Sequence, residues 1–347
     1  MSKDFYETLK KAGETTELDQ EDIKILLTAG ENESPVLFKL ADEVRARHLG
    51  NRVHLRGIIE FSNYCRQNCH YCGLRSANIN LPRYRLSRQE IYTTAQAAAG
   101  LGYKTLVLQA GEDNHYSPRE IAGLIRDIKK LDVAVTLSCG EHDYKTYRLW
   151  REAGADRYLL KHETADPVLY ERIRPGKTLA ARLQCQTWLK ELGYQLGSGC
   201  MVGLPGQTLD TLARDLLLLK KMNVDMAGIG PFIPHPETPL AGSKQGTLSM
   251  TLKMIAVARL MLPLLHLPAT TALGTIHPAG REMALQAGGN VVMPNVSPTE
   301  FRELYQIYPN KICSKDRPGD CRNCISGKIL ALGRTVANDY GHSPKFL

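Results

Sequence analysis

Three closely spaced cysteines stand out as residues that could do chemistry. They follow the pattern Cys65-x3-Cys69-x2-Cys72. A structural zinc site normally has four protein ligands. Three thiolates instead suit a four-iron cluster whose fourth iron stays open to a small molecule. The spacing therefore predicts an iron–sulfur cluster with one open iron, and structural zinc or three unlinked thiols are the alternatives.

A second group of cysteines has the pattern Cys313-x7-Cys321-x2-Cys324. It falls in a Lys-, Asp-, Gly- and Pro-rich stretch, residues 311–323, which predicts a surface loop far from the main site. Thiolate chemistry alone allows zinc or iron–sulfur here.

The remaining three of the nine cysteines are isolated in the sequence. Cys185 lies in an expected helix, so a buried, inert thiol is the simplest interpretation. Cys139 and Cys200 lie near the ends of expected strands, where they could border a cavity.

The composition is that of a globular protein. Of 347 residues, 43% are hydrophobic and 23% charged, which excludes disorder as the main state. Forty-four basic against 36 acidic residues give +8, and the one local basic cluster, Arg83, Arg85 and Arg88, is interpreted as solvated surface rather than a nucleic-acid footprint. The odd cysteine count argues against a disulfide framework. With no apolar run of ~18 residues and a polar start, Met1 to Asp4, we expect a cytoplasmic protein without nucleic-acid or membrane partners.

Short apolar strands alternate with helices from Val53 onward. The expected strands are 53–61, 105–109, 133–137, 157–160, 195–201, 226–230, 269–272 and 290–293. Capping boxes at Ser87/Glu90 and Ser117/Glu120 begin two of the helices. Alternating strands and helices predict a parallel sheet, and eight such units predict a (β/α)8 TIM-type barrel; an open doubly wound sheet is the alternative.

Two further segments flank this barrel. Residues 1–52 are expected to form an N-terminal helical layer, with Asp19 and Ser34 as N-caps. The barrel then spans 53–300, and 301–347 form a C-terminal extension that carries the second cysteine group. In such a barrel the active site lies at the carboxyl ends of the strands. The first cysteine group directly follows the first strand, so it should lie at that end.

The segment from Cys65 to Cys72, with Tyr71 before the last cysteine, resembles the signature of radical S-adenosylmethionine (SAM) enzymes. The resemblance implies that a [4Fe–4S] cluster on Cys65, Cys69 and Cys72 binds SAM through its open iron. One electron passed to SAM then releases methionine and a 5′-deoxyadenosyl radical. A closed barrel suits this step, because a primary radical must be kept from water.

Other segments are similar to the HydE type of [FeFe]-hydrogenase maturases, within the biotin synthase-like group. They are Phe61–Asn63, Gln109–Asp113, Arg157–Pro167 and Gly203–Thr208. By this resemblance Glu163 would bind the ribose hydroxyls of SAM, Arg182 the methionine carboxylate, and Gly111 with Glu112 the ammonium group. Tyr71, Thr136, Lys161 and Met201 would complete the cofactor site. The family often has Arg where Lys161 stands.

The same resemblance implies a function in building the di-iron subcluster of [FeFe]-hydrogenase. The substrate would be an iron–cysteine complex with CO and cyanide, delivered by another maturase, with ferredoxin or flavodoxin as electron donor. Cys313, Cys321 and Cys324 would hold a second cluster, [2Fe–2S] or [4Fe–4S]. The candidate residues of the substrate cavity are Arg56, Gln109, Met226, Thr270, Thr271, Met293, Tyr305 and Tyr308.

Three other functions are weighed against this interpretation. Biotin synthase holds a further cluster with a cysteine where this chain has Gly197, which argues against it. Methylornithine synthase shares the barrel type and is harder to exclude. A non-catalytic iron–sulfur scaffold would not need Glu112, Glu163 and Arg182 to bind SAM.

Overall fold

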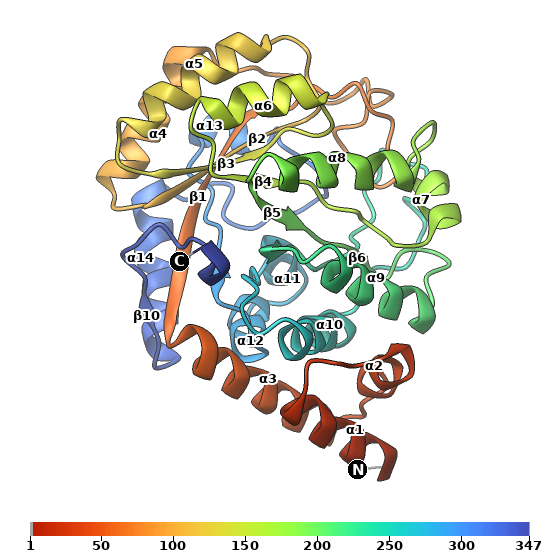
Figure 1. Ribbon diagram of the computed structural model, residues 1–347. Helices are drawn as coiled ribbons and strands as arrows, with labels where there is room; N and C mark the ends of the chain where they lie inside the picture. The colour runs from red at the N-terminus through yellow and green to blue at the C-terminus, as the bar shows by residue number, and fades with distance from the viewer. Residues whose placement is uncertain (1–2, 347) are drawn as a thin grey trace.

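The computed structural model describes residues 3–346, so residues 1, 2 and 347 of the two expected terminal segments lie outside the described residues. Its centre is a curled parallel sheet in the order β10-β1-β2-β3-β4-β5-β7 (Figure 1). A further strand, β9, also pairs with β1, at His54 and Leu55. The strands are β1 (Arg52–Ser62), β2 (Thr105–Ala110), β3 (Ala134–Ser138), β4 (Arg157–Leu159), β5 (Gln195–Ser198), β7 (Met226–Ala227), β9 (Val291–Val292) and β10 (Thr335–Val336). The expected TIM-type fold is confirmed.

The ring closes through a segment that is not a regular strand. Isolated parallel bridges join Met226 to His266 and Pro268 to Val291, which links β7 to β9. The expected strand 269–272 is therefore wrong: Thr271 and Ala272 begin the short helix α11 (Thr271–Ile276). Because Pro268 has no N–H to donate, a regular hydrogen-bonded strand cannot run through this position.

Two other expected strands are interrupted. Residues 195–201 divide into β5 and β6 (Met201–Val202), and residues 226–230 into β7 and β8 (Gly230–Pro231). Gly199 lies between β5 and β6 at φ +148°, and a Cβ atom there would overlap the carbonyl oxygen of Gly228. The two backbone segments, around Gly199 and Gly228, approach too closely at this point to leave room for a side chain. The pairing of β5 with β7 therefore ends here, and it resumes as the β6–β8 pair.

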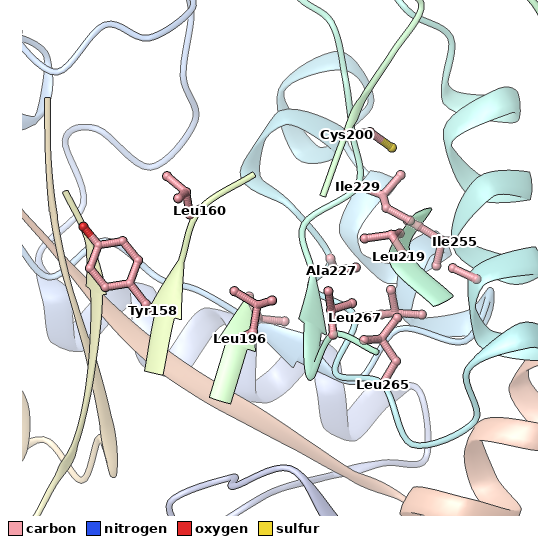
Figure 2. Packing of buried hydrophobic residues seen from close by; sticks show 14 of the residues in the cluster. Tyr158, Leu160, Leu196, Cys200, Leu219, Ala227, Ile229, Ile255, Leu265 and Leu267 are labelled. Carbon is pink, nitrogen blue, oxygen red and sulfur yellow. The ribbon is translucent and has the colours of Figure 1, made fainter. Parts of the chain in front are cut away.

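Side-chain alternation along the strands separates the apolar core from the barrel interior. In β2 and β3 the core members are Leu106, Leu108, Val135 and Leu137. Figure 2 shows the continuation of this cluster, with Leu196, Ala227 and Leu267 beside Leu219 and Ile255 of the surrounding helices. The residues between them, such as Gln109 and Thr136, face the opposite side. The apolar core thus lies between strands and helices, and the barrel interior is left for polar groups.

The helices are close to those expected. They are α1 (Lys3–Glu14), α2 (Gln20–Leu27), α3 (Ser34–Leu49), α4 (Arg88–Gly100), α5 (Pro118–Lys129), α6 (Tyr144–Glu152), α7 (Pro167–Ile173), α8 (Leu179–Glu191), α9 (Leu209–Lys221), α10 (Leu248–Met261), α12 (Gly280–Gln286), α13 (Thr299–Arg302) and α14 (Pro318–Ala331). Both capping boxes, at Ser87 and Ser117, are present, as is the N-cap at Asp19. The N-cap of α3 is Glu33, and Ser34 is already helical.

The two terminal regions cover different parts of the barrel. Helices α1, α2 and α3 pack together against α9 and α10 (Figure 1). The C-terminal segment closes the amino-terminal end of the barrel, where Arg56, Arg157 and Thr105 all donate to backbone carbonyls of Tyr340 or Gly341. The site can therefore open only toward the other end. None of the helices described between residues 3 and 346 is long and apolar enough to span a membrane.

Candidate active site

The loop that carries the first cysteines leaves β1 and returns alongside it. We call residues 63–86 the cysteine loop. Its ends are joined by an antiparallel bridge between Ser62 and Arg85 and by a 2.8 Å hydrogen bond from the Leu86 amide to the Phe61 carbonyl. This closure holds the loop at the carboxyl end of β1, where a TIM-type barrel binds its substrates.

The three sulfurs of this loop are free and half-buried. Burial raises the pKa of Cys69 to about 11, and burial also raises the pKa of Cys65 and Cys72. Cluster binding would release these protons, because the thiolate is the ligand. Within residues 3–346 no three His, Cys, Asp or Glu side chains are placed to hold a single metal ion.

Two glycines allow other chain segments to reach the cysteine loop. A Cβ atom at Gly111 would overlap the Tyr64 carbonyl oxygen, and one at Gly73 would overlap the Gln306 carbonyl and the His235 ring. The segment after β2 therefore packs directly on Cys65, whose Cβ would lie 2.8 Å from that added atom. Gly111 thus lies beside a predicted cluster ligand, and its contact with the cofactor stays a prediction.

Glu112 is buried beneath the cysteine loop. Its carboxylate accepts a short hydrogen bond from Gln67, lies 3.6 Å from Arg66 Nε and lies 3.5 Å from Arg174 Nη2. Arg174, at the end of α7, was not predicted. Its guanidinium is buried, its Nε has no partner among the described residues, and its charge acts on Cys69. No local sequence signal indicates Arg174, because only the fold brings α7 to this loop.

Glu163 is held in an unusual backbone conformation. Its φ of +66° lies in the left-handed region, which costs a non-glycine residue on the order of 1–3 kcal/mol. Its amide donates to Gly199 (3.0 Å), and its carbonyl accepts from Met201 (3.0 Å). Its carboxylate has no hydrogen-bond partner among residues 3–346, while its charge acts on Cys69 and Tyr71. An unpaired carboxylate close to the cysteine loop fits the predicted ribose contact.

A buried network supports this turn. His162 Nδ1 lies 2.9 Å from Ser198 Oγ, and His162 Nε2 lies 3.4 Å from Asp215 Oδ1. Asp215 in turn accepts a hydrogen bond from the Ala165 amide. The network fixes the chain on both sides of Glu163, which lets the strained conformation persist.

Arg182, on α8, is buried and partly paired. Its Nε lies 2.9 Å from Glu141 Oε1 and donates to the Tyr170 hydroxyl at 3.1 Å. Lys177 also lies 3.3 Å from Glu141. In the described part of the chain the two terminal nitrogens of Arg182 meet no hydrogen-bond acceptor. They remain available for the methionine carboxylate that the resemblance predicts.

Two hydroxyls in the barrel have no partner among the described residues. Thr136 on β3 and Thr270 before α11 have buried Oγ1 atoms without a hydrogen bond. Buried polar groups normally find a partner, so these two indicate a ligand. Tyr71 and Met201 pack on one small apolar cluster, and the end of the Lys161 side chain lies against Gly228. The cysteines, Glu163, Arg182 and Thr136 thus fit a cluster with SAM, and the Thr270 hydroxyl is free for a further ligand.

The cavity candidates fall into separate places. Gln109 faces Tyr305, and Tyr308 lies near Thr275 and Arg281. Thr271 and Met293 line a small cavity of about 20 Å³. Arg56 donates to Met226 Sδ (2.9 Å) and to the Gly341 carbonyl (3.0 Å), so both residues lie toward the closed end.

The second cysteine group differs from the prediction. Cys313 is in a loop, but Cys321 and Cys324 lie on α14, so the stretch 311–323 is not simply a surface loop. Pro318 in the first turn of α14 explains this, because proline is favoured where a helix begins. Cys313 and Cys321 also line the same small cavity as Glu60 and Met293. The group therefore borders the barrel wall and is not remote from it.

The sulfurs of this second group lie close together. A hydrogen bond with Cys321 lowers the pKa of Cys313 to about 6, with a further contribution from Arg281, whose Nη2 is 3.8 Å from the sulfur. Cys324 follows Cys321 by three residues, so both lie on one face of α14.

The ion pair of Glu60 and Lys311 joins this region to β1. Lys311 Nζ lies 2.8 Å from both carboxylate oxygens, and the two side chains are only 5% and 10% exposed. We expect Lys311→Met to lower the free energy of unfolding by about 3–5 kcal/mol, because Glu60 would stay buried without its counter-charge. Lys315→Met is the control, since Lys315 is 83% exposed. Equal urea midpoints for the two variants would contradict this expectation.

The other cysteines belong to the apolar core. Cys139, Cys185 and Cys200 are buried members of the main hydrophobic cluster, and Figure 2 shows Cys200 beside Ile229. The prediction of a buried Cys185 is confirmed.

The barrel and its cysteine loop define a class of iron–sulfur enzyme, and comparison with known proteins agrees. Residues 59–219 match the family model described as the radical SAM superfamily. The chain belongs to this superfamily. A [4Fe–4S] cluster and SAM are the cofactors that the family implies.

Among the relatives, the [FeFe] hydrogenase maturase subunit HydE of Thermotoga maritima is 52% identical over 339 residues, 98% of this chain and 97% of that protein. The 3-methylornithine synthase of Methanosarcina acetivorans is 34% identical and covers 89% of this chain and 88% of that protein. A crystal structure of methylornithine synthase superposes with a TM-score of 0.85 at 28% identity, over 95% of this chain and 97% of that chain.

Proposed function

We propose that this chain is a radical SAM maturase that acts in the assembly of the di-iron subcluster of [FeFe]-hydrogenase. The observation that carries the proposal is the 52% identity to the HydE maturase along 98% of this chain. Methylornithine synthase shares the fold but is less similar, at 34% identity. The substrate that we propose is an iron–cysteine complex with CO and cyanide, delivered by another maturase.

Different residues would bind the cluster and the parts of SAM. Cys65, Cys69 and Cys72 would hold the cluster, which together with SAM supplies reductive cleavage and the 5′-deoxyadenosyl radical. Glu163 would accept from the ribose, and the terminal nitrogens of Arg182 would donate to the methionine carboxylate. Lys161 offers a single ammonium, and so a point charge rather than the planar fork of an arginine.

The cavity residues would then contact the substrate. We propose that Gln109, Tyr305 and the free hydroxyl of Thr270 bind it, because they belong to the polar interior near the carboxyl ends of the strands. Thr271 and Met293 would line the small cavity beside Glu60, and Tyr308 would lie near Arg281 of that cavity. Arg56 and Met226 would bound the cavity at its closed end.

A reconstituted maturation assay tests the proposal. Hydrogenase that lacks its di-iron subcluster is incubated with the other maturases, reductant and SAM, and hydrogen evolution is measured. We expect hydrogen evolution only when this chain is added, and none with the matched Cys69→Ala variant. Absence of activity from a preparation that cleaves SAM would contradict the proposal, and 3-methylornithine among its products would favour the alternative.

We also propose a second iron–sulfur cluster on Cys313, Cys321 and Cys324. The closeness of the first two sulfurs and the position of the third on the same face of α14 support it. We expect Cys324→Ser to lose the second cluster signal in electron paramagnetic resonance (EPR) spectra. The variant should keep cleavage of SAM, because Cys324 is exposed on α14 and is not part of the cysteine loop.

The control for this variant is Asn323→Ser on the same exposed turn. If Cys324→Ser loses SAM cleavage while the control keeps it, the second site takes part in the chemistry. If all iron signals are unchanged, the three cysteines do not hold a cluster.

A further inference from the structure

The Arg83 side chain binds the cysteine loop at both ends. Its Nη1 donates to the carbonyls of Asn63 (2.5 Å) and Leu74 (3.0 Å). Its Nη2 donates to the carbonyls of Arg75 (2.8 Å) and Asn78 (3.0 Å). One acceptor precedes the three cysteines and the other three follow them. A single guanidinium therefore ties the entry of the loop to its exit.

The local chain geometry brings Arg83 to this position. Asn63 donates from Nδ2 to the Pro82 carbonyl (2.8 Å), and its Oδ1 accepts from the Tyr84 amide (2.7 Å). Asn78 Nδ2 donates to the Gly73 carbonyl (2.8 Å). These contacts align residues 82–84 with the start of the loop, so the guanidinium of Arg83 lies between the start of the loop and residues 74–78.

The neighbouring arginines have different partners. Arg85 forms an ion pair with Asp113 (2.7 Å) and stacks on the Tyr64 ring, and Arg88 forms an ion pair with Asp127. The interpretation of all three as solvated surface is therefore wrong for Arg83, whereas Arg85 and Arg88 are exposed and each forms an ion pair. Of the three, only Arg83 has no carboxylate within ion-pair distance among the described residues.

The charge of Arg83 is thus not neutralised where it lies near the cysteines. Its Nη1 donates to the carbonyls of Asn63 and Leu74, which stand two residues before Cys65 and two residues after Cys72, so the guanidinium lies beside both ends of the cysteine run. A nearby positive charge stabilises the more negative state of an iron–sulfur cluster, which is the reduced state.

We propose that Arg83 is a positioning residue for the first cluster, holding the cysteine loop closed through four carbonyls and favouring the reduced state through its unpaired charge. This inference rests on the proposed cluster at Cys65, Cys69 and Cys72. Loop closure requires a planar guanidinium with several donors, which lysine lacks, whereas the electrostatic effect requires only a positive charge. Substitution by lysine or by glutamine therefore separates the two effects.

The test uses the reconstituted full chain and the variants Arg83→Gln and Arg83→Lys. The rate of iron loss to a ferrous chelator measures loop closure, and an EPR-monitored titration with dithionite measures the midpoint of the one-electron reduction. We expect both variants to lose iron about tenfold faster or more, because at least two charge-assisted hydrogen bonds disappear. We expect the midpoint to move to more negative values in Arg83→Gln only.

The matched control is Arg88→Gln, which removes an arginine five residues away that is 58% exposed and forms its ion pair with Asp127, outside the loop. It should match the unaltered protein in both measurements. Iron loss at the control rate in Arg83→Gln would overturn the positioning role, and an unchanged midpoint would overturn the electrostatic one. Failure of the unaltered protein to assemble a cluster would instead refute the proposed function, so the two failures are distinguishable. Circular dichroism of the cofactor-free variants separates loop opening from global unfolding.

Discussion

Replacing Cys65, Cys69 or Cys72 with alanine is expected to abolish reductive cleavage of SAM. Each substitution removes one of three protein ligands of a cluster whose fourth iron must stay open. Among the described residues, the cysteine loop contains no fourth cysteine that could replace a lost ligand. The measurement is the yield of 5′-deoxyadenosine with dithionite as reductant, together with bound iron.

The control for these variants is Cys185→Ala. Cys185 is buried on α8 but belongs to the apolar core, so its loss should leave cleavage and iron content near those of the unaltered chain. Cleavage retained by a variant lacking all three loop cysteines would end the assignment of the cluster to this loop.

Glu163→Ala and Arg182→Ala are expected to weaken SAM binding while the cluster still assembles. Each substitution removes a charge-assisted contact, which corresponds to about a ten- to hundredfold loss of affinity. Neither residue touches the cysteine sulfurs in a hydrogen bond, so the iron content should be unchanged. Calorimetric titration of the anaerobic protein with SAM gives the affinity.

A matched substitution of an exposed acid, Glu171→Ala on α7, controls for the loss of a carboxylate in Glu163→Ala. Arg182→Ala also leaves Glu141 with Lys177 as its one ion-pair partner among residues 3–346, so the unfolding midpoint of this variant should fall as well. If both variants bind SAM with the affinity of the control, Glu163 and Arg182 have been assigned the wrong roles.

Much of the barrel was predictable from the sequence, because local patterns determine it. Alternating strands and helices predicted the parallel sheet, and the capping boxes at Ser87 and Ser117 placed two helix starts correctly. A strand or a cap depends on residues within a few positions of one another. The prediction of a seventh strand was wrong because the apolar pattern at 269–272 outweighed Pro268, whose missing N–H prevents a regular ladder and leaves only isolated bridges.

For the site, too, the local part was predictable from the sequence and the long-range part was not. The spacing of Cys65, Cys69 and Cys72 was sufficient to predict a cluster, since all its ligands lie within one loop. The groups that surround this loop come from elsewhere in the chain. Arg174 reaches it from α7, and the C-terminal segment closes the far end of the barrel.

The supporting contacts of the cysteine loop depended on tertiary structure alone. Arg83 lies close in sequence to the cysteines, yet its four carbonyl acceptors became visible only when the loop was folded back on itself. The position of Cys321 beside the barrel wall likewise follows from the docking of α14. A sequence specifies which groups are available within one element, but long-range packing decides which of them meet. Here the sequence by itself determined the cofactor chemistry, and only the tertiary structure decided which charges hold that chemistry in place.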